Sequence, residues 1–228
     1  ATSLSITMTE PPLPDDTDVN YLYELYHKNL SPVVSTAALE PAATAEQSSA
    51  TPDKQYRRAT QTPLAQPETS ALTAAIQQRA SYRDGTERRP ITDTELATLL
   101  TYAYGELREG AATPRRPVAS GGARYPLELY PIVLDSPDID AGIYHYNSRD
   151  SALDQLAAGE YTDWLRDHWT WITSADQVAA AIVITARPGH AADRYGELAY
   201  LLAALEAGAV IQTLQLIATD LGIVSRTH

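Results

Sequence analysis

The chain has no cysteine among its 228 residues. That absence excludes disulfides, thiolate metal sites and cysteine nucleophiles, so redox chemistry would require a bound cofactor. Positive charge is also scarce, because 17 lysines and arginines face 29 acidic residues and leave a formal net charge of −12. A chain this acidic is not expected to have nucleic acid or an anionic membrane surface as its main partner.

Long apolar runs and targeting signals are missing as well. No run approaches the roughly 20 apolar residues that span a bilayer, and no basic and apolar signal begins the chain. We therefore expect a cytoplasmic protein. The five histidines lack the short, regular spacings of a helical zinc site, so we predict no metal, and we expect His145, between two tyrosines, to be structural.

The length of 228 residues suits one domain of medium size with a sizeable core. Residues 18–29 carry apolar side chains at helical spacing and predict a short amphipathic helix. Residues 31–70 are rich in proline, alanine, threonine, serine and glutamine, which is typical of a linker or a surface arm. We therefore predict an N-terminal helix and arm over residues 1–69 and a compact domain over residues 70–228.

The compact domain carries the patterns of both helices and strands. Thr92 to Glu95 form a capping box that begins a helix, and the apolar run over 179–186 favours a strand covered on both faces. The apolar surface over 193–221 is wide, which is typical of a core helix, here softly interrupted at Gly208. The predicted helices cover 71–80, a segment from Thr92, and 193–221, and the predicted strands cover 127–134, 142–146 and 179–186.

Residues 115–130 join an arginine pair to a small-residue turn and then to an apolar strand. Gly121 and Gly122 tolerate positive φ and let backbone approach a ligand, while Ser120 offers a hydroxyl. Arg115 and Arg116 offer fixed charge and forked donors. The pattern indicates a loop that holds a flat anionic ligand, although an ordinary turn has a similar composition.

Positive charge is concentrated around this segment. From Arg79 to Arg124 there are eight arginines and six acidic residues, a local charge of +2 in a chain of −12. Guanidinium groups pair with phosphate in bidentate fashion, so the patch favours a phosphate-bearing ligand. The alternative is that these arginines balance acidic residues on the surface.

Four blocks in this order and spacing resemble the flavin-dependent nitroreductase superfamily, most closely its SagB-type branch, which includes the azoline dehydrogenases. The resemblance extends from about Arg79 to Gly222. The blocks are Arg79-x-Ser81-x-Arg83, residues 115–128, Gly142-Ile143-Tyr144-His145-Tyr146, and Arg194-Tyr195-Gly196 followed by Glu206-Ala207-Gly208 and Gln212.

The resemblance implies an α+β, nitroreductase-like fold with a central mixed or antiparallel sheet, flanking helices and a long central helix. Family members continue through a last strand and arm, which we expect this chain to lack. The resemblance also implies FMN as the cofactor and a homodimer with FMN at the subunit interface. Residues implied to bind FMN are Arg79, Ser81, Arg83, Arg116, Ser120, Gly121, Gly122 and Gln212.

For catalysis the resemblance points to Arg194 and Tyr195, because azoline dehydrogenases of the family use a Lys-Tyr pair for the proton step. Arginine stays protonated in proteins, which leaves Tyr195 as the candidate base. A phenol serves as a base near neutral pH only if positive charge lowers its pKa.

Three functions follow from the resemblance. The first is FMN-dependent dehydrogenation of thiazoline or oxazoline rings in a ribosomally made peptide, with cyclodehydratase partners. The second is an NAD(P)H-dependent reductase of nitroaromatic or quinone-type substrates, which the arginine at position 194 favours slightly. The third is a degenerate, non-catalytic subunit.

Overall fold

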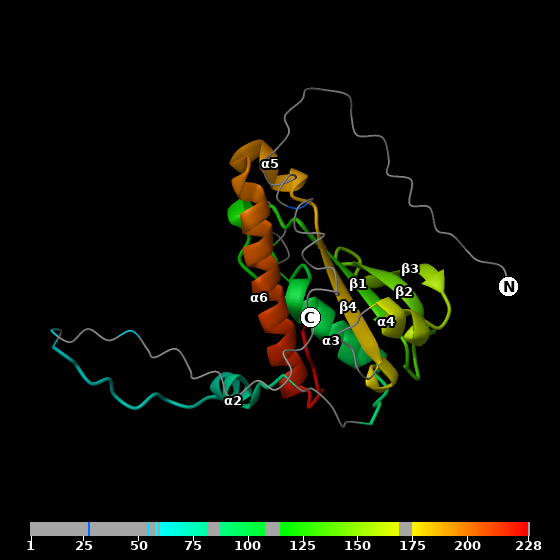
Figure 1. The fold of residues 1–228 in the computed structure, drawn as a ribbon, viewed down its shortest axis with the longest axis horizontal. Helices are drawn as coiled ribbons and strands as arrows, with labels where there is room; N and C mark the ends of the chain where they lie inside the picture. Colours follow the sequence, from blue (N-terminus) through cyan, green and yellow to red (C-terminus); the bar gives the residue numbers. More distant parts are fainter. Residues whose placement is uncertain are drawn as a thin grey trace, which may run out of the picture.

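The computed structural model describes residues 60–81, 87–107, 115–168 and 175–227, together with the single positions His27, Lys54 and Arg58. Arg83 lies outside the described residues. So does nearly all of the predicted N-terminal helix and arm, as far as residue 59. Figure 1 shows the arrangement of the elements. In chain order they are α2 (Ala71–Gln78), α3 (Asp93–Tyr104), the 3-10 turn η2 (Gly121–Ala123), β1 (Leu127–Val133), β2 (Gly142–Asn147), β3 (Ala152–Ala158), α4 (Thr162–His168), the 3-10 turn η3 (Ala175–Gln177), β4 (Ala180–Ala186), α5 (Gly189–Tyr195) and α6 (Leu198–Asp220).

The four strands form one antiparallel sheet in the order β3-β2-β1-β4. Val133 is opposite Gly142 on one side and Ala180 on the other, which fixes the register of β1. The predicted strands are confirmed as β1, β2 and β4, and the sheet is the antiparallel form of the two that were expected. The expectation that β4 is covered on both faces is confirmed for its first five residues, because Ala180, Ile182 and Ile184 pack on one core and Ala181 and Val183 on the other. Its last two residues, Thr185 and Ala186, are exposed, and β4 is an edge strand of the sheet.

Helices cover both faces of the sheet. On one face, α3 and α6 pack together and form the larger core with β1 and β2. On the other face, Leu165 of α4 and Ala175 of η3 pack against Ile132 and Ala181. The predicted capping box is confirmed at the start of α3, where Thr92 accepts a hydrogen bond from the Glu95 amide at 3.2 Å and the Glu95 carboxylate accepts one from the Thr92 amide at 3.1 Å.

The long C-terminal helix differs from the prediction in where it is broken. α5 ends at Gly196, which has φ 52° and ψ −133°, a conformation that only glycine adopts readily. α6 then runs through Gly208 without interruption, because that glycine keeps helical geometry. Glycine therefore interrupts this part of the chain once, twelve residues before the predicted position.

α6 is also less buried than expected of a core helix. It buries a stripe that includes Ala199, Ala203 and Val210, whereas Leu198, Leu201 and Leu205 are 48%, 53% and 63% exposed. By length and composition alone α6 could cross a membrane, contrary to the expectation that no such segment exists. In this structure its buried stripe packs against α3, β1 and β4 as part of the domain.

Candidate functional site

The glycine loop, which we define as residues 120–125, has an unusual backbone. Gly122 has φ 63°, and the non-glycine residues Ala123 and Tyr125 have φ 53° and 47°. Positive φ in residues with a Cβ costs on the order of 1–3 kcal/mol each and persists where the surroundings hold it. The loop is therefore a strained segment that its neighbours stabilise.

The loop lies against the break between α5 and α6. A Cβ atom added to Gly122 would lie 2.7 Å from the hydroxyl oxygen of Tyr195, and one added to Gly121 would lie 2.9 Å from Cδ1 of Leu202. Both contacts are closer than a real Cβ tolerates, so the glycines permit this approach. The structure thus brings Gly121 and Gly122, two of the residues expected to bind a cofactor, next to the predicted catalytic Tyr195.

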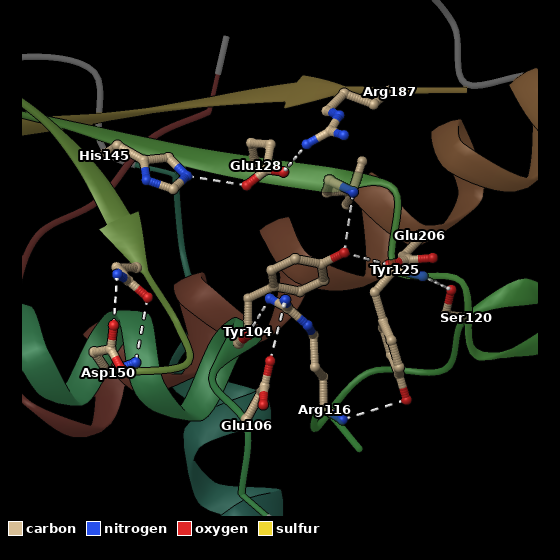
Figure 2. A network of polar contacts seen from close by, with 12 residues as sticks. Tyr104, Glu106, Arg116, Ser120, Tyr125, Glu128, His145, Asp150, Arg187 and Glu206 are labelled. Atoms are coloured by element: carbon tan, nitrogen blue, oxygen red, sulfur yellow. Dashed lines mark hydrogen bonds and ion pairs between the residues drawn. The ribbon is translucent and has the colours of Figure 1, made fainter. Parts of the chain in front are cut away.

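Behind the loop, Figure 2 shows a buried network of polar side chains. The Tyr104 hydroxyl donates to Oε1 of Glu206 at 2.7 Å and accepts from the Leu127 amide at 3.1 Å. The Ser120 hydroxyl accepts from the Tyr125 amide at 2.9 Å, and the Tyr125 hydroxyl accepts from the Arg116 amide at 3.3 Å. The network joins α3, the glycine loop, the start of β1 and α6.

Burial shifts the pKa values of this network. Burial, and then the hydrogen bond to Glu206, raise the pKa of the Tyr104 phenol, so Tyr104 remains a neutral donor. Burial also raises the pKa of Glu206, whereas hydrogen bonds from Ser120 and Tyr104 and the charge of Arg116 lower it. Glu206 is 3% exposed.

Arg116 is committed to groups of the protein itself. Its side chain is 15% exposed, its Nη1 donates to the Tyr104 carbonyl at 2.8 Å, and its Nη2 lies 3.9 Å from the Glu106 carboxylate. The guanidinium carbon lies 4.2 Å from the ring centroid of Tyr104 and 5.5 Å from that of Tyr125, within cation–π range. The Arg116 side chain therefore braces the loop, and contact with a cofactor stays a prediction for this residue.

The remaining predicted site residues lie apart from the loop. Arg79 follows the last residue of α2, and its Nη1 donates to the Ser81 hydroxyl at 3.4 Å. α2 packs against α6, and Figure 1 places it beside the C-terminal end of α6, away from α5 and the loop. Gln212 is exposed on α6. Arg194 is exposed, with its guanidinium 5.6 Å from the ring centroid of Tyr195.

A second polar group lies on the far side of the sheet from α6. Nε2 of His145 is 3.0 Å from one oxygen of the Glu128 carboxylate, and Arg187 donates to the other at 3.1 Å. An open cavity of about 260 Å³ borders this group, lined by Glu106, Arg116, Glu128, His145, Tyr146, Asn147, Ser148, Arg149 and Asp150. The contacts of His145 agree with the structural role expected for it.

Sequence reasoning gave no role to Tyr104, Tyr125 or Glu206. One signal was available for Glu206, which continues the spacing of Ala199, Ala203 and Val210 on the buried stripe of α6. A charged residue on an apolar stripe needs buried partners. No local pattern could name Tyr104 as that partner, because the two residues are 102 positions apart.

Two curated proteins resemble parts of this chain. A nitroreductase-like protein of Methanocaldococcus jannaschii is 30% identical over 139 residues, which cover 59% of this chain and 66% of that protein. The trifolitoxin-processing protein TfxB of Rhizobium leguminosarum bv. trifolii is 45% identical over 60 residues, which cover 26% of this chain and 14% of TfxB. The chain thus spans just under two thirds of the first relative and a small part of the second.

Solved structures share the fold. A nitroreductase-like protein of Anabaena variabilis matches with a TM-score of 0.55 and 23% identity over 66% of this chain and 30% of that one. A nitroreductase-like protein of Ralstonia eutropha matches with a TM-score of 0.52 and 21% identity over 70% of this chain and 71% of that one. A chain of the Escherichia coli microcin synthetase McbBCD complex with truncated pro-MccB17 bound matches with a TM-score of 0.55 and 19% identity. The match covers 88% of this chain and 84% of that one.

The sequence profile described as the nitroreductase family matches residues 76–225, well over half of the chain. The matched range contains the glycine loop, Tyr195, Glu206 and the whole sheet. By this match the chain belongs to the nitroreductase family.

Proposed function

We propose that the protein is an FMN-dependent oxidoreductase of the SagB type. The observation that carries the proposal is the contact between the strained glycine loop and Tyr195, which joins two of the predicted blocks in one place. Membership of the nitroreductase family supports a flavin as the cofactor. The whole protein's activity is proposed from the domain, since the chain matches only part of its relatives.

The residues present fit a flavin nucleotide. Gly122 is exposed and has no side chain, so backbone amides of the loop can approach a flat ring. Arg79 and Ser81 supply a guanidinium and a hydroxyl suited to phosphate, and in the structure they contact each other. We propose that these residues and Gln212 hold FMN, with Arg83, which lies outside the described residues, as a further phosphate contact.

Arg79 and Ser81, next to α2, lie near one end of α6, and the glycine loop lies near the other end. The helix has 23 residues and is therefore about 35 Å long. A single copy does not bring them together. We propose a homodimer in which two α6 helices pack antiparallel, so that Arg79 and Ser81 of one protomer approach the glycine loop of the other. The exposed apolar side chains of Leu198, Leu201 and Leu205 support this arrangement, since they recur at helical spacing on one side of α6.

For the chemistry, bound FMN would supply a hydride acceptor at its N5 atom. Tyr195 is the residue that we propose to hold the proton removed from the substrate, because its hydroxyl oxygen faces the loop. Arg194 carries a fixed positive charge beside Tyr195, with its guanidinium carbon 5.6 Å from the ring centroid.

We propose that the substrate is a thiazoline or oxazoline ring in a ribosomally made peptide, with cyclodehydratase partners. The similarity to a trifolitoxin-processing protein and to a microcin synthetase complex supports peptide modification. The second candidate is an NAD(P)H-dependent nitro or quinone reductase. The observation in its favour is Arg194. It stands at the position where the azoline dehydrogenases, which this chain resembles, carry a lysine that acts in the proton step.

The first experiment is a visible absorption spectrum of the purified protein before and after FMN is added and the excess removed. Retained flavin near one per chain is expected, and Arg79→Gln should lower that ratio, whereas the exposed control Arg226→Gln should not. Absence of flavin after reconstitution would contradict the proposal and leave the non-catalytic subunit. Without oxygen, loss of the flavin absorbance when a thiazoline peptide is added would favour the dehydrogenase, and Tyr195→Phe should not show this loss. Loss of the flavin absorbance with NADPH alone would favour the reductase.

A further inference from the structure

We infer that Arg124 and Asp193 form a positioning pair that holds α5, and with it Tyr195, against the glycine loop. Nη2 of Arg124 donates to Oδ2 of Asp193 at 3.2 Å, so the pair joins the loop to α5. The inference rests on the proposed function, because Tyr195 is the residue to which we assign the proton step. None of the roles in binding or proton transfer proposed above uses Arg124 or Asp193.

α5 is too short to keep its place without tertiary contacts. It has seven residues, whereas isolated helices shorter than about 12 residues are marginal in water. It starts after Pro188 and ends before Gly196, and its buried residue is Ala191. It packs mainly against α6, and Figure 1 shows it at the end of α6 where that helix begins. The direction of α5 therefore depends on a small number of contacts.

The start of α5 is anchored to the sheet. The Arg187 amide donates to the Pro126 carbonyl at 2.7 Å, directly after the glycine loop. The Arg187 guanidinium donates to the Glu128 carboxylate of β1 at 3.1 Å, as Figure 2 shows. Both contacts lie at the same end of α5. They fix the place where the helix begins and leave its direction open.

The other end of α5 meets the glycine loop at two points. One point is Gly122, where an added Cβ would lie 2.7 Å from the Tyr195 hydroxyl oxygen. The other is the ion pair between Arg124 and Asp193. The two points are two residues apart on the loop and two residues apart on α5. A helix can pivot about one contact but not about two, so the ion pair sets how the Tyr195 hydroxyl faces the loop.

Arg124 also lies in the strained part of the loop. It stands between Ala123 and Tyr125, which have φ 53° and 47°. Arg124 itself has an ordinary right-handed conformation, with φ −85° and ψ −24°, and its amide donates to the Gly121 carbonyl at 3.4 Å. Strained residues keep their conformation only where neighbours hold them. The bond from Arg124 to α5 therefore restrains the loop as well as the helix.

The exposure of the pair sets the size of its effect. The side chains of Arg124 and Asp193 are 38% and 65% exposed. Ion pairs in contact with solvent are weak, and salt screens them. A weak contact can still decide the direction of a short helix that has few other contacts. We therefore expect local effects of about two- to fivefold and little change in the temperature of unfolding.

Amide hydrogen exchange of α5 in the flavin-free full chain tests the inference. The Ala192 amide donates to the Pro188 carbonyl at 3.1 Å, and the Gly196 amide donates to the Ala192 carbonyl at 2.8 Å, so both amides report opening of the helix. We expect exchange of both amides to be about two- to fivefold faster in Asp193→Asn and in Arg124→Gln. Each variant removes one charge of the pair.

Charge exchange and salt show whether the ion pair itself is the cause. Arg124→Asp and Asp193→Arg should each speed the exchange, and the double variant should restore it, because opposite charges then face each other again. In the wild type, raising NaCl from about 0.1 M to about 1 M shortens the Debye length from about 10 Å to about 3 Å, so exchange should approach that of D193N. Asp176→Asn is the matched control, because it breaks an exposed pair with Arg166 of α4 and should leave α5 unchanged.

The rate of flavin reduction gives a measurement that a purely structural pair would not change. With FMN bound and oxygen absent, a saturating thiazoline peptide is expected to reduce the flavin about two- to fivefold more slowly in D193N than in the wild type. The peptide concentration that gives half of the maximal rate should stay the same, because we place neither Arg124 nor Asp193 in contact with the peptide. The double charge exchange should recover the rate.

The outcomes separate this inference from the proposed function. Unchanged exchange of α5 in folded D193N and R124Q overturns the inference, whether or not FMN binds. Faster exchange that the double charge exchange reverses supports the inference, even in a protein that binds no FMN and so contradicts the proposed function. Faster exchange together with an unchanged rate of flavin reduction overturns the role of the pair in positioning Tyr195.

Discussion

Gly122 combines a left-handed backbone with a close neighbour. An alanine there would adopt φ 63° with difficulty, and its Cβ would lie 2.7 Å from the Tyr195 hydroxyl oxygen. We expect Gly122→Ala to lower the free energy of unfolding by about 1–3 kcal/mol, as measured by urea denaturation. Tyr195→Phe in the same chain removes the hydroxyl and should recover part of the loss.

Gly222 provides the control for this prediction. It has a similar φ of 66°, but an added Cβ would meet nothing within 4 Å. Gly222→Ala should therefore show the cost of the backbone alone, and the difference between the two alanine variants measures the contact with Tyr195. Equal losses in both variants would mean that the loop does not depend on that contact.

The same residues show what sequence reasoning reaches at this scale. The glycine pair could be placed in a ligand-holding loop because glycine has local signatures. The positive φ of Ala123 and Tyr125 could not be predicted, because tertiary contacts impose it on residues that do not favour it. The use of Arg116 inside the protein also depends on a partner outside its own segment, the Tyr104 carbonyl, twelve positions earlier in the chain.

Among the elements, α3 begins at the capping box of Thr92 and Glu95, whose contribution to stability depends on pH. Hydrogen bonds from Arg89 and from the Thr92 amide lower the pKa of Glu95. A carboxyl group whose pKa is lower in the folded state than in the unfolded state adds stability at pH values above its unfolded pKa. This added stability is lost as the pH falls through the folded pKa. Glu95→Gln keeps a capping side chain but loses the charge, so we expect it to destabilise the protein by about 0.5 kcal/mol at pH 7.

In acid the loss should vanish, because Glu95 is then protonated in the wild type as well. Thermal denaturation at pH 7 and at pH values below the folded pKa of Glu95 gives this comparison. The exposed Glu68, which precedes α2, supplies the control Glu68→Gln. A deficit in E95Q that is the same at both pH values would show that the charge of Glu95 is not the cause.

The elements that were predicted are those whose signals are local. The capping box of α3 and the apolar runs of β1, β2 and β4 lie within single segments. β3 was missed because its sequence, Ala-Leu-Asp-Gln-Leu-Ala-Ala, has weak strand propensity and forms a strand by pairing with β2. The break at Gly196 instead of Gly208 could not be predicted either, since both are glycines and the packing of α5 decides between them.

At the scale of the whole molecule, the separation of the predicted site residues is the finding that sequence order could not give. The four blocks follow one another along the chain, yet α2 and the glycine loop contact different ends of α6. The distance between them is set by the length of one helix. We therefore propose that a binding site which uses both groups is completed by a second copy of the chain.

In the proposed dimer, oligomeric state and cofactor binding depend on the same interface. Leu201 is 53% exposed near the start of α6, between the exposed Leu198 and Leu205, so Leu201→Glu places a charge where we propose that two helices meet. We expect L201E to be monomeric by light scattering after size-exclusion chromatography and to lose FMN at the same time. Leu156→Glu is the matched control, because Leu156 is similarly exposed, at 58%, on the edge strand β3. A monomeric L201E that still binds FMN would show that one chain completes the site, and a dimeric L201E would move the interface away from α6.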